Sequence, residues 1–145
     1  MYKRQALSLD RLTGAGLLFR NGIPPHANYV FKHVLIRDAA YGTLPRSRRQ
    51  ELHRQIICVL QREFAELVVS QPELLAHHCS EAGMIFEAIE YYLSAAQRAT
   101  AASNDTEKIA HISRGLSLLE QLPASDQRTG ELRGRLTLGG ALFLW

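Results

Sequence analysis

The chain has 145 residues, of which 46% are hydrophobic and 21% charged, a balance typical of a globular protein with one ordinary domain or two very small ones. Its net charge of +3 is too small to indicate nucleic-acid binding unless it is concentrated, and no run is apolar over a length that spans a membrane. The two cysteines, Cys58 and Cys79, have no partner spacing, so we expect a reducing, cytoplasmic setting.

The first third of the chain predicts a short helix, a hairpin and a second helix. Leucines recur on one side of residues 5–16, which favours a helix that ends at a glycine. Two short extended runs, LLFR and YVF, flank the turn-rich stretch NGIPPHAN and predict a β-hairpin. A helical period then begins at His33, and Gly42 and Pro45 break it.

A long amphipathic helix is predicted from Arg46 to Phe64. Its apolar side is expected to consist of Leu52, Ile56, Val59, Leu60 and Phe64. The start of this helix carries a basic patch, which we define as Arg46, Arg48, Arg49 and Arg54. Arginines at a helix start oppose the helix dipole, which indicates acidic groups nearby in the same chain or in a neighbouring domain. The alternative is phosphate contact in a nucleic acid, although the residues that follow are apolar and suited to packing.

The rest of the sequence predicts helices at about 72–82, 85–101, 105–121 and 126–144. The segment FEAIEYYLSAA is echoed twenty residues later by TEKIAHISRGL, which suggests stacked helix pairs. The spacing of a tetratricopeptide repeat is matched by Leu75, Ala76, Ala88, Tyr92 and Ala95, with Cys79 where a tyrosine is usual. Small residues in this pattern let helices approach closely, and we expect the tyrosine to fill the groove between them.

No catalytic constellation is present in the sequence. A phosphate-binding P-loop requires a lysine after a glycine, and none of the lysines here follows one. The stretch AHHCSE offers metal-ligand types, but neighbouring helix residues point about 100° apart, and only His77 and Glu81 lie one turn from each other. Two ligands do not make a zinc site, so we predict neither a metal site nor an independent enzyme.

Three stretches are characteristic in combination: LDRLTGAGLLFRNG, YVFKHVLIRDAAYGTLPRSRRQELHR, and the helical region that begins QPELLAHHCSEAG. Together they resemble the C-terminal part of bacterial signal-transduction ATPases of the STAND class, which are related to AAA ATPases. This class includes large proteins that join an adenylate or guanylate cyclase domain to a predicted ATPase. The similarity covers nearly the whole chain and is most specific over residues 31–49 and the hairpin before them.

The resemblance implies a mainly α fold in three parts. Residues 1–45 would form a partial winged-helix segment with one short β-hairpin, residues 46–70 a linking helix, and residues 71–145 a truncated tetratricopeptide-like αα-hairpin array. In this class the winged helix packs on a nucleotide-binding domain rather than on DNA. The chain would then be a non-catalytic, regulatory segment that couples a nucleotide switch to a helical-repeat sensor. ATP or ADP and Mg²⁺ are expected on that other domain, in the same protein or in a partner chain, and no cofactor is expected here.

The resemblance also singles out His33. The segment FKHVLIRDAAY is similar to the Met-His-Asp segment of related nucleotide switches, in which the histidine approaches the bound diphosphate. Lys32 and Val34 replace the methionine and the aspartate, so His33 alone carries over as a nucleotide-sensing candidate. From the residues alone, a histidine bonded to local backbone at a helix N-terminus is the alternative.

The repeat surface is expected to bind a protein partner. Its candidate contact residues are His78, Glu81, Glu90, Tyr91 and Gln97. The apolar stretch LTLGGALFLW indicates a repeat without a polar cap, from which we expect self-association. A DNA-binding transcriptional regulator that uses the basic patch is the alternative function, and it predicts binding that weakens steeply with salt. We expect neither a membrane nor, under the first hypothesis, a nucleic acid as partner.

Overall fold

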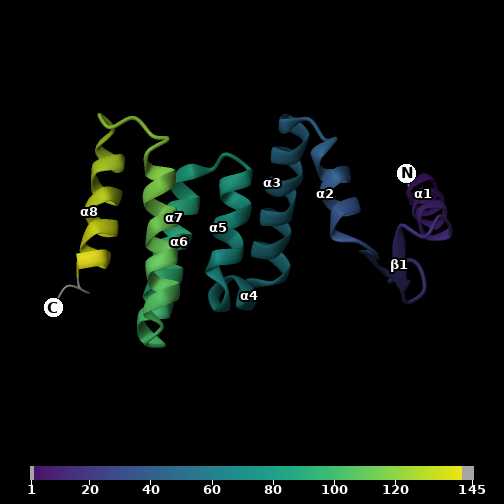
Figure 1. The fold of residues 1–145 in the computed structure, drawn as a ribbon, viewed down its shortest axis with the longest axis horizontal. Coiled ribbons are helices and arrows are strands. Elements are labelled where there is room, and N and C mark those ends of the chain that lie inside the picture. The colour runs from purple at the N-terminus through teal and green to yellow at the C-terminus, as the bar shows by residue number, and fades with distance from the viewer. Residues whose placement is uncertain (1, 142–145) are drawn as a thin grey trace. The chain divides into compact units, whose positions relative to one another are not determined.

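The structure, a computed structural model, describes residues 2–141. These residues are mainly helical, with one short two-stranded antiparallel sheet (Figure 1). The predicted fold class, mainly α with one short β-hairpin, is thereby confirmed. The chain divides into two compact units between Pro45 and Arg46.

The first unit contains a helix, a hairpin and a second helix. These elements are α1 (Tyr2–Gly14), β1 (Leu18–Asn21), β2 (Asn28–Phe31) and α2 (Val34–Gly42). The strands pair antiparallel, with Leu18 opposite Phe31 and Asn21 opposite Asn28. Leu18 is 5% exposed, whereas Phe19 and Val30 are exposed, so the hairpin buries little apolar surface. A lone hairpin of this length is marginal in water and depends on the helices beside it.

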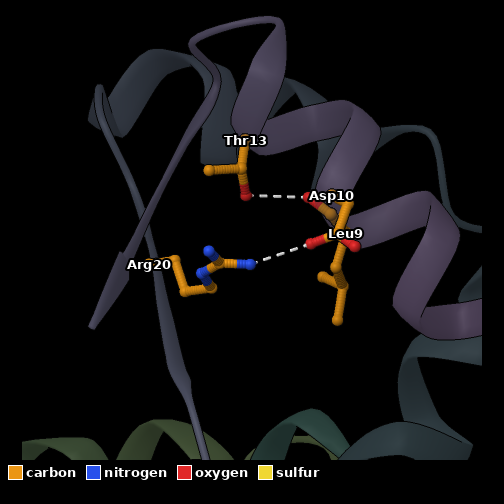
Figure 2. A network of polar contacts seen from close by, with 4 residues as sticks. All are labelled: Leu9, Asp10, Thr13 and Arg20. Carbon is orange, nitrogen blue, oxygen red and sulfur yellow. Dashed lines mark hydrogen bonds and ion pairs between the residues drawn. The ribbon is translucent and has the colours of Figure 1, made fainter. Parts of the chain in front are cut away.

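An ion pair joins α1 to the hairpin. The guanidinium of Arg20 on β1 lies 3.0 Å from the carboxylate of Asp10 on α1, as Figure 2 shows. One turn along the helix, the hydroxyl of Thr13 donates a 2.8 Å hydrogen bond to the carbonyl of Leu9. Both partners of the ion pair are about half exposed, so it orients the strand and contributes at most about 1 kcal/mol of stability.

The second unit is entirely helical over its described residues. Its elements are α3 (Arg46–Glu63), α4 (Ala65–Ser70), α5 (Pro72–Glu81), α6 (Ile85–Ala101), α7 (Asp105–Leu119) and α8 (Gln127–Ala141). α3 packs on α5, α5 on α6, α6 on α7 and α7 on α8, so successive helices form a row. The four helices predicted after residue 70 are confirmed to within a few residues. The last three residues of the predicted 126–144 helix lie outside the described range.

Local sequence signals set the ends of these helices. Pro72 begins α5, where its missing N–H costs no hydrogen bond. Gly83 forms the turn after α5 with a φ of +79°, a conformation that glycine adopts without strain. Asn104 caps α7, because its side chain accepts a 3.2 Å hydrogen bond from the backbone N–H of Glu107. Short turns of this kind make α5, α6 and α7 antiparallel neighbours.

The core of the second unit is centred on α6. Ile89 and Ala88 on this helix are 0% exposed, and they pack in one cluster with residues of α3, α5, α7 and α8. All residues at the tetratricopeptide spacing are buried, namely Leu75, Ala76, Cys79, Ala88, Tyr92 and Ala95. Three of these are alanines, which allow the close helix approach that the sequence predicted.

The buried side of α3 differs from the prediction. The helix buries His53 and Ile57, whereas the predicted Ile56 and Val59 are 39% and 42% exposed. The observed face is therefore shifted around the helix from the predicted one, and the predicted Leu52 and Leu60 lie half-buried at its edge. Apolar residues alone do not indicate that His53 is buried, and its ring contacts His78 of α5. The helix also ends at Glu63, and Phe64 precedes the separate short helix α4.

Candidate functional site

A groove runs along α5 and α7, with α6 as its floor. It contains two hollows of about 260 Å³ and 420 Å³, each lined by all three helices. The first hollow lies near the starts of α5 and α7, and its polar residues include Glu73, Arg98, Glu107 and His111. The second lies near their ends and is lined by His77, Ser80, Tyr92, Ser113, Arg114 and Ser117, together with a leucine. We call this pair of hollows the α5/α7 groove.

Tyr92 and His111 meet where the two hollows adjoin. Tyr92 is 6% exposed and lies between the helices, the place that the sequence predicted for it. Its ring stacks on the imidazole of His111, with centroids 6.2 Å apart and planes inclined by 27°. Burial raises the pKa of the Tyr92 phenol, although the Arg114 guanidinium, which donates a hydrogen bond to it, acts in the opposite direction. Tyr92 therefore stays neutral and holds Arg114 at the edge of the second hollow.

Replacing His111 by phenylalanine is expected to stabilise the protein. The Nδ1 atom of His111 is buried and forms no hydrogen bond with the described residues. A phenyl ring keeps the stack on Tyr92 and removes this desolvated nitrogen, for a gain of about 1 kcal/mol. Thermal unfolding should then rise by a few degrees. A lower melting temperature for His111→Phe would contradict this reading of the ring.

Three imidazoles gather between α3 and α5, and we call them the histidine cluster: His53, His77 and His78. The Nδ1 atoms of His53 and His78 lie 2.8 Å apart, and their ring centroids are 5.1 Å apart. The His77 ring lies 5.4 Å from that of His78 and 6.1 Å from that of His53. A hydrogen bond between two Nδ1 atoms needs one of them as acceptor, so at least one of the two rings must be neutral.

The surroundings favour the neutral state of both bonded rings. Burial lowers the pKa of His53 below its ordinary value of 6.5, and the nearby carboxylate of Glu81 counteracts this, while His77 adds to it. Burial also lowers the pKa of His78, with further lowering from His53 and His77 and opposition from Glu81. The histidine cluster therefore joins α3 to α5 best when it is uncharged.

Stability of the second unit is expected to fall as the pH drops below about 6.5. Because the pKa values of His53 and His78 are lower in the folded state, the unfolded chain binds protons at a higher pH than the folded protein does. The stability that the neutral histidines contribute is therefore lost as the pH falls. Urea unfolding at pH 7.5 and 5.5 measures the loss. His78→Gln should reduce the difference between the two pH values, whereas His26→Gln, in the first unit, should leave it unchanged. Equal pH dependence in His78→Gln and the wild type would contradict the role of the cluster.

The five residues proposed from sequence as partner contacts occupy three places. His78 and Glu81 lie at the histidine cluster. Glu90 on α6 forms a 2.7 Å ion pair with Arg135 on α8. Tyr91 and Gln97 both line a further hollow that α4, α5 and α6 form, with a volume of about 490 Å³. None of the five lines either hollow of the α5/α7 groove.

The basic patch is partly engaged in holding helices together. Arg54 on α3 donates a 3.2 Å hydrogen bond to the carbonyl of Ala82, the residue that caps the C-terminus of α5. A cation at this position interacts favourably with the helix dipole. Arg49 is half-buried, while Arg46 and Arg48 are exposed. The hydrogen bond of Arg54 favours the intramolecular interpretation of the patch over phosphate contact.

His33 lies in the first unit, at the residue that precedes α2. Its side chain is exposed and does not cap the helix, whereas its backbone carbonyl accepts hydrogen bonds from the N–H groups of Ile36 and Arg37. The imidazole is therefore not committed to capping α2, and it is accessible to a ligand or a neighbouring domain.

Within residues 2–141, no group of three or more His, Cys, Asp or Glu side chains is arranged to hold a metal ion. Along the same residues, no helix combines the length and apolar character needed to cross a membrane.

Apart from His77 and Tyr92, the α5/α7 groove brings together residues that the sequence analysis did not single out. Arg114, His111 and Ser117 on α7, and His77 and Ser80 on α5, are polar residues repeated at three- or four-residue spacing. That spacing indicates a common helix face, and it could have been read from the sequence. The spacing does not indicate which faces of α5 and α7 meet across α6, because that depends on tertiary packing.

A comparison with curated proteins finds a relative in Rhizobium meliloti (strain 1021), described as an uncharacterized protein. It is 28% identical to this chain over 121 residues. The alignment covers 83% of the chain and 12% of the relative, so the chain spans a small part of that protein's length. No protein-family profile matches the chain, and no solved structure matches it.

Proposed function

We propose that the second unit is a non-catalytic module that binds an extended protein segment in the α5/α7 groove. The observation that carries this proposal is the groove itself, in which two hollows adjoin over a shared floor. Arrays of helix pairs bind partners on such surfaces through shape and scattered polar groups. The polar lining of both hollows and the ring stack between them supply groups of this kind.

We further propose that this module is a regulatory part of a larger signalling ATPase of the STAND class, located in the cytoplasm. Two observations support this. The residues at the tetratricopeptide spacing are all buried, as such a repeat requires. The Rhizobium meliloti relative is much longer than the region it shares with this chain. ATP or ADP and Mg²⁺ would be held by a nucleotide-binding domain outside this sequence, which contains no P-loop.

Site-specific photocrosslinking tests the binding proposal. A photoreactive p-benzoylphenylalanine is placed at Ser113, which is exposed and lines the second hollow. The matched control places it at Ile109, one turn earlier on α7, which is 59% exposed and lines neither hollow. In cells, a defined adduct is expected at Ser113 and not at Ile109. Identical adduct patterns at both positions, or adducts at Ile109 alone, would count against the groove.

His33 gives a test of the ATPase context. In the proposed full-length protein, His33→Ala should weaken the affinity for ADP, because a neutral or protonated imidazole donates a hydrogen bond to phosphate oxygen. His26→Ala, another exposed histidine of the first unit, serves as the control. Unchanged ADP affinity and unchanged basal signalling in His33→Ala would remove His33 from the nucleotide switch.

A further inference from the structure

The two hollows of the α5/α7 groove differ in charge. The first contains the carboxylates of Glu73 and Glu107 and one guanidinium, that of Arg98. Arg98 donates a 3.1 Å hydrogen bond to the carbonyl of Val69, a neutral group that leaves its charge in place, so two carboxylates face one guanidinium. Neither Glu73 nor Glu107 forms an ion pair with another described side chain. The first hollow is therefore acidic overall.

The second hollow has the opposite character. Its lining contains the guanidinium of Arg114 and no aspartate or glutamate. Arg114 is bonded to the neutral phenol of Tyr92, so its charge is not cancelled by that contact. Three serine hydroxyls, from Ser80, Ser113 and Ser117, add hydrogen-bond donors around the same space. This combination of a guanidinium and several hydroxyls suits a carboxylate.

The spacing of the charged residues defines the length of ligand that spans both hollows. Along α5, Glu73 and His77 are separated by one turn, or about 6 Å of helix rise. Along α7, Glu107 and Arg114 are separated by seven residues, or about 10 Å. An extended peptide advances about 3.3 Å per residue, so two or three residues cover this distance.

We propose that the α5/α7 groove selects an extended peptide segment in which an acidic and a basic residue lie two or three positions apart. The acidic side chain accepts hydrogen bonds from Arg114 and the serines of the second hollow. The basic side chain lies between Glu73 and Glu107 in the first. This inference rests on the proposed function, because it names the class of segment that the groove binds.

Selection from a phage-displayed library of random 12-residue peptides tests the proposal on the 145-residue chain. Sequences that bind the wild type are expected to carry Asp or Glu two or three positions from Lys or Arg. Arg114→Glu should lower the affinity of those peptides about tenfold at low salt, through loss of one attraction and gain of one repulsion. Arg133→Glu makes the same charge change at an exposed position on α8 that lines neither hollow, and it should leave the affinity unchanged.

Glu107→Lys provides a second charge reversal at the other end of the groove, and circular dichroism verifies that each variant is folded. In this variant, selection should lose its preference for basic residues and keep its preference for acidic ones. Selected peptides that lack the charge pair, yet crosslink at Ser113, would overturn this inference and leave the proposed function in place. If no peptide is selected and no adduct forms at Ser113, both are overturned.

Discussion

Ile89→Ala is expected to lower the free energy of unfolding of the second unit by about 2–5 kcal/mol. Ile89 is 0% exposed and lies on α6, the helix on which α5 and α7 both pack. Its truncation removes buried apolar surface and leaves a cavity that the surrounding helices fill only in part. Urea unfolding followed by helical circular dichroism measures the change.

Ile109→Ala provides the matched control, since Ile109 is 59% exposed on the neighbouring helix α7. The same chemical change there should alter stability by no more than about 0.5 kcal/mol, the usual range for surface substitutions. Similar losses in Ile89→Ala and Ile109→Ala would mean that α6 is not the centre of the core. Because α6 is also the floor of the α5/α7 groove, Ile89→Ala should weaken peptide binding together with stability.

Gly115→Val is expected to destabilise the packing of α7 on α8 by about 1–3 kcal/mol. A Cβ atom at Gly115 would lie 2.8 Å from Cδ2 of Leu136, which is too close for two carbon atoms. Leu136 is 0% exposed, so its side chain has little free space into which to move. Gly130→Val on α8 is the control, because the corresponding Cβ position has no neighbour within 4 Å apart from its own stretch of helix.

A double mutant tests the cause of that effect. Leu136→Ala alone should destabilise the protein, because it opens a cavity in the core. Combined with Gly115→Val, it should cost clearly less than the sum of the two single changes, since the valine occupies the space that the leucine leaves. Additive losses in the double mutant would show that Gly115 and Leu136 are not in contact.

Apart from the break between α3 and α4, the helices and the hairpin could be predicted from the sequence because local signals specify them. Pro72 at a helix start, Gly83 at a turn and Asn104 at a cap each act within a few residues. The buried face of α3 could not be predicted in this way. Its orientation depends on the hydrogen bond between His53 and His78, which are 25 positions apart. Hydrophobic periodicity considers only apolar residues, so it does not predict the burial of a histidine that is hydrogen-bonded to another helix.

Of the α5/α7 groove, the sequence predicted only the position of Tyr92 on its floor, α6. The tetratricopeptide spacing marked Tyr92 as a residue between helices, and the structure places it there. Arg114 and Glu107, which give the groove its charge pattern, are ordinary exposed helix residues in the sequence. They lie across the groove from Glu73 and His77 because α5 and α7 pack on the same side of α6. This arrangement depends on long-range contacts, which no local sequence pattern indicates.

The histidine cluster gives the protein a second property that the sequence did not reveal. It connects α3 to α5 through a bond that requires a neutral ring, next to the His77 side chain that also lines the second hollow. Acidification is therefore expected to loosen the contact of α3 with α5. Peptide affinity should therefore weaken as the pH falls below about 6.5, because this contact holds α5, one wall of the α5/α7 groove.

Backbone NMR of the 145-residue chain, recorded with and without a peptide selected on it, locates the binding site. We predict that the largest shift changes fall on residues 73–80 of α5 and 107–117 of α7, with the Tyr92 region of α6 between them. Arg114→Glu should abolish these changes at the same peptide concentration. Changes centred instead on the hollow between α4 and α6, or on residues 2–45, would contradict the assignment of the α5/α7 groove as the binding site.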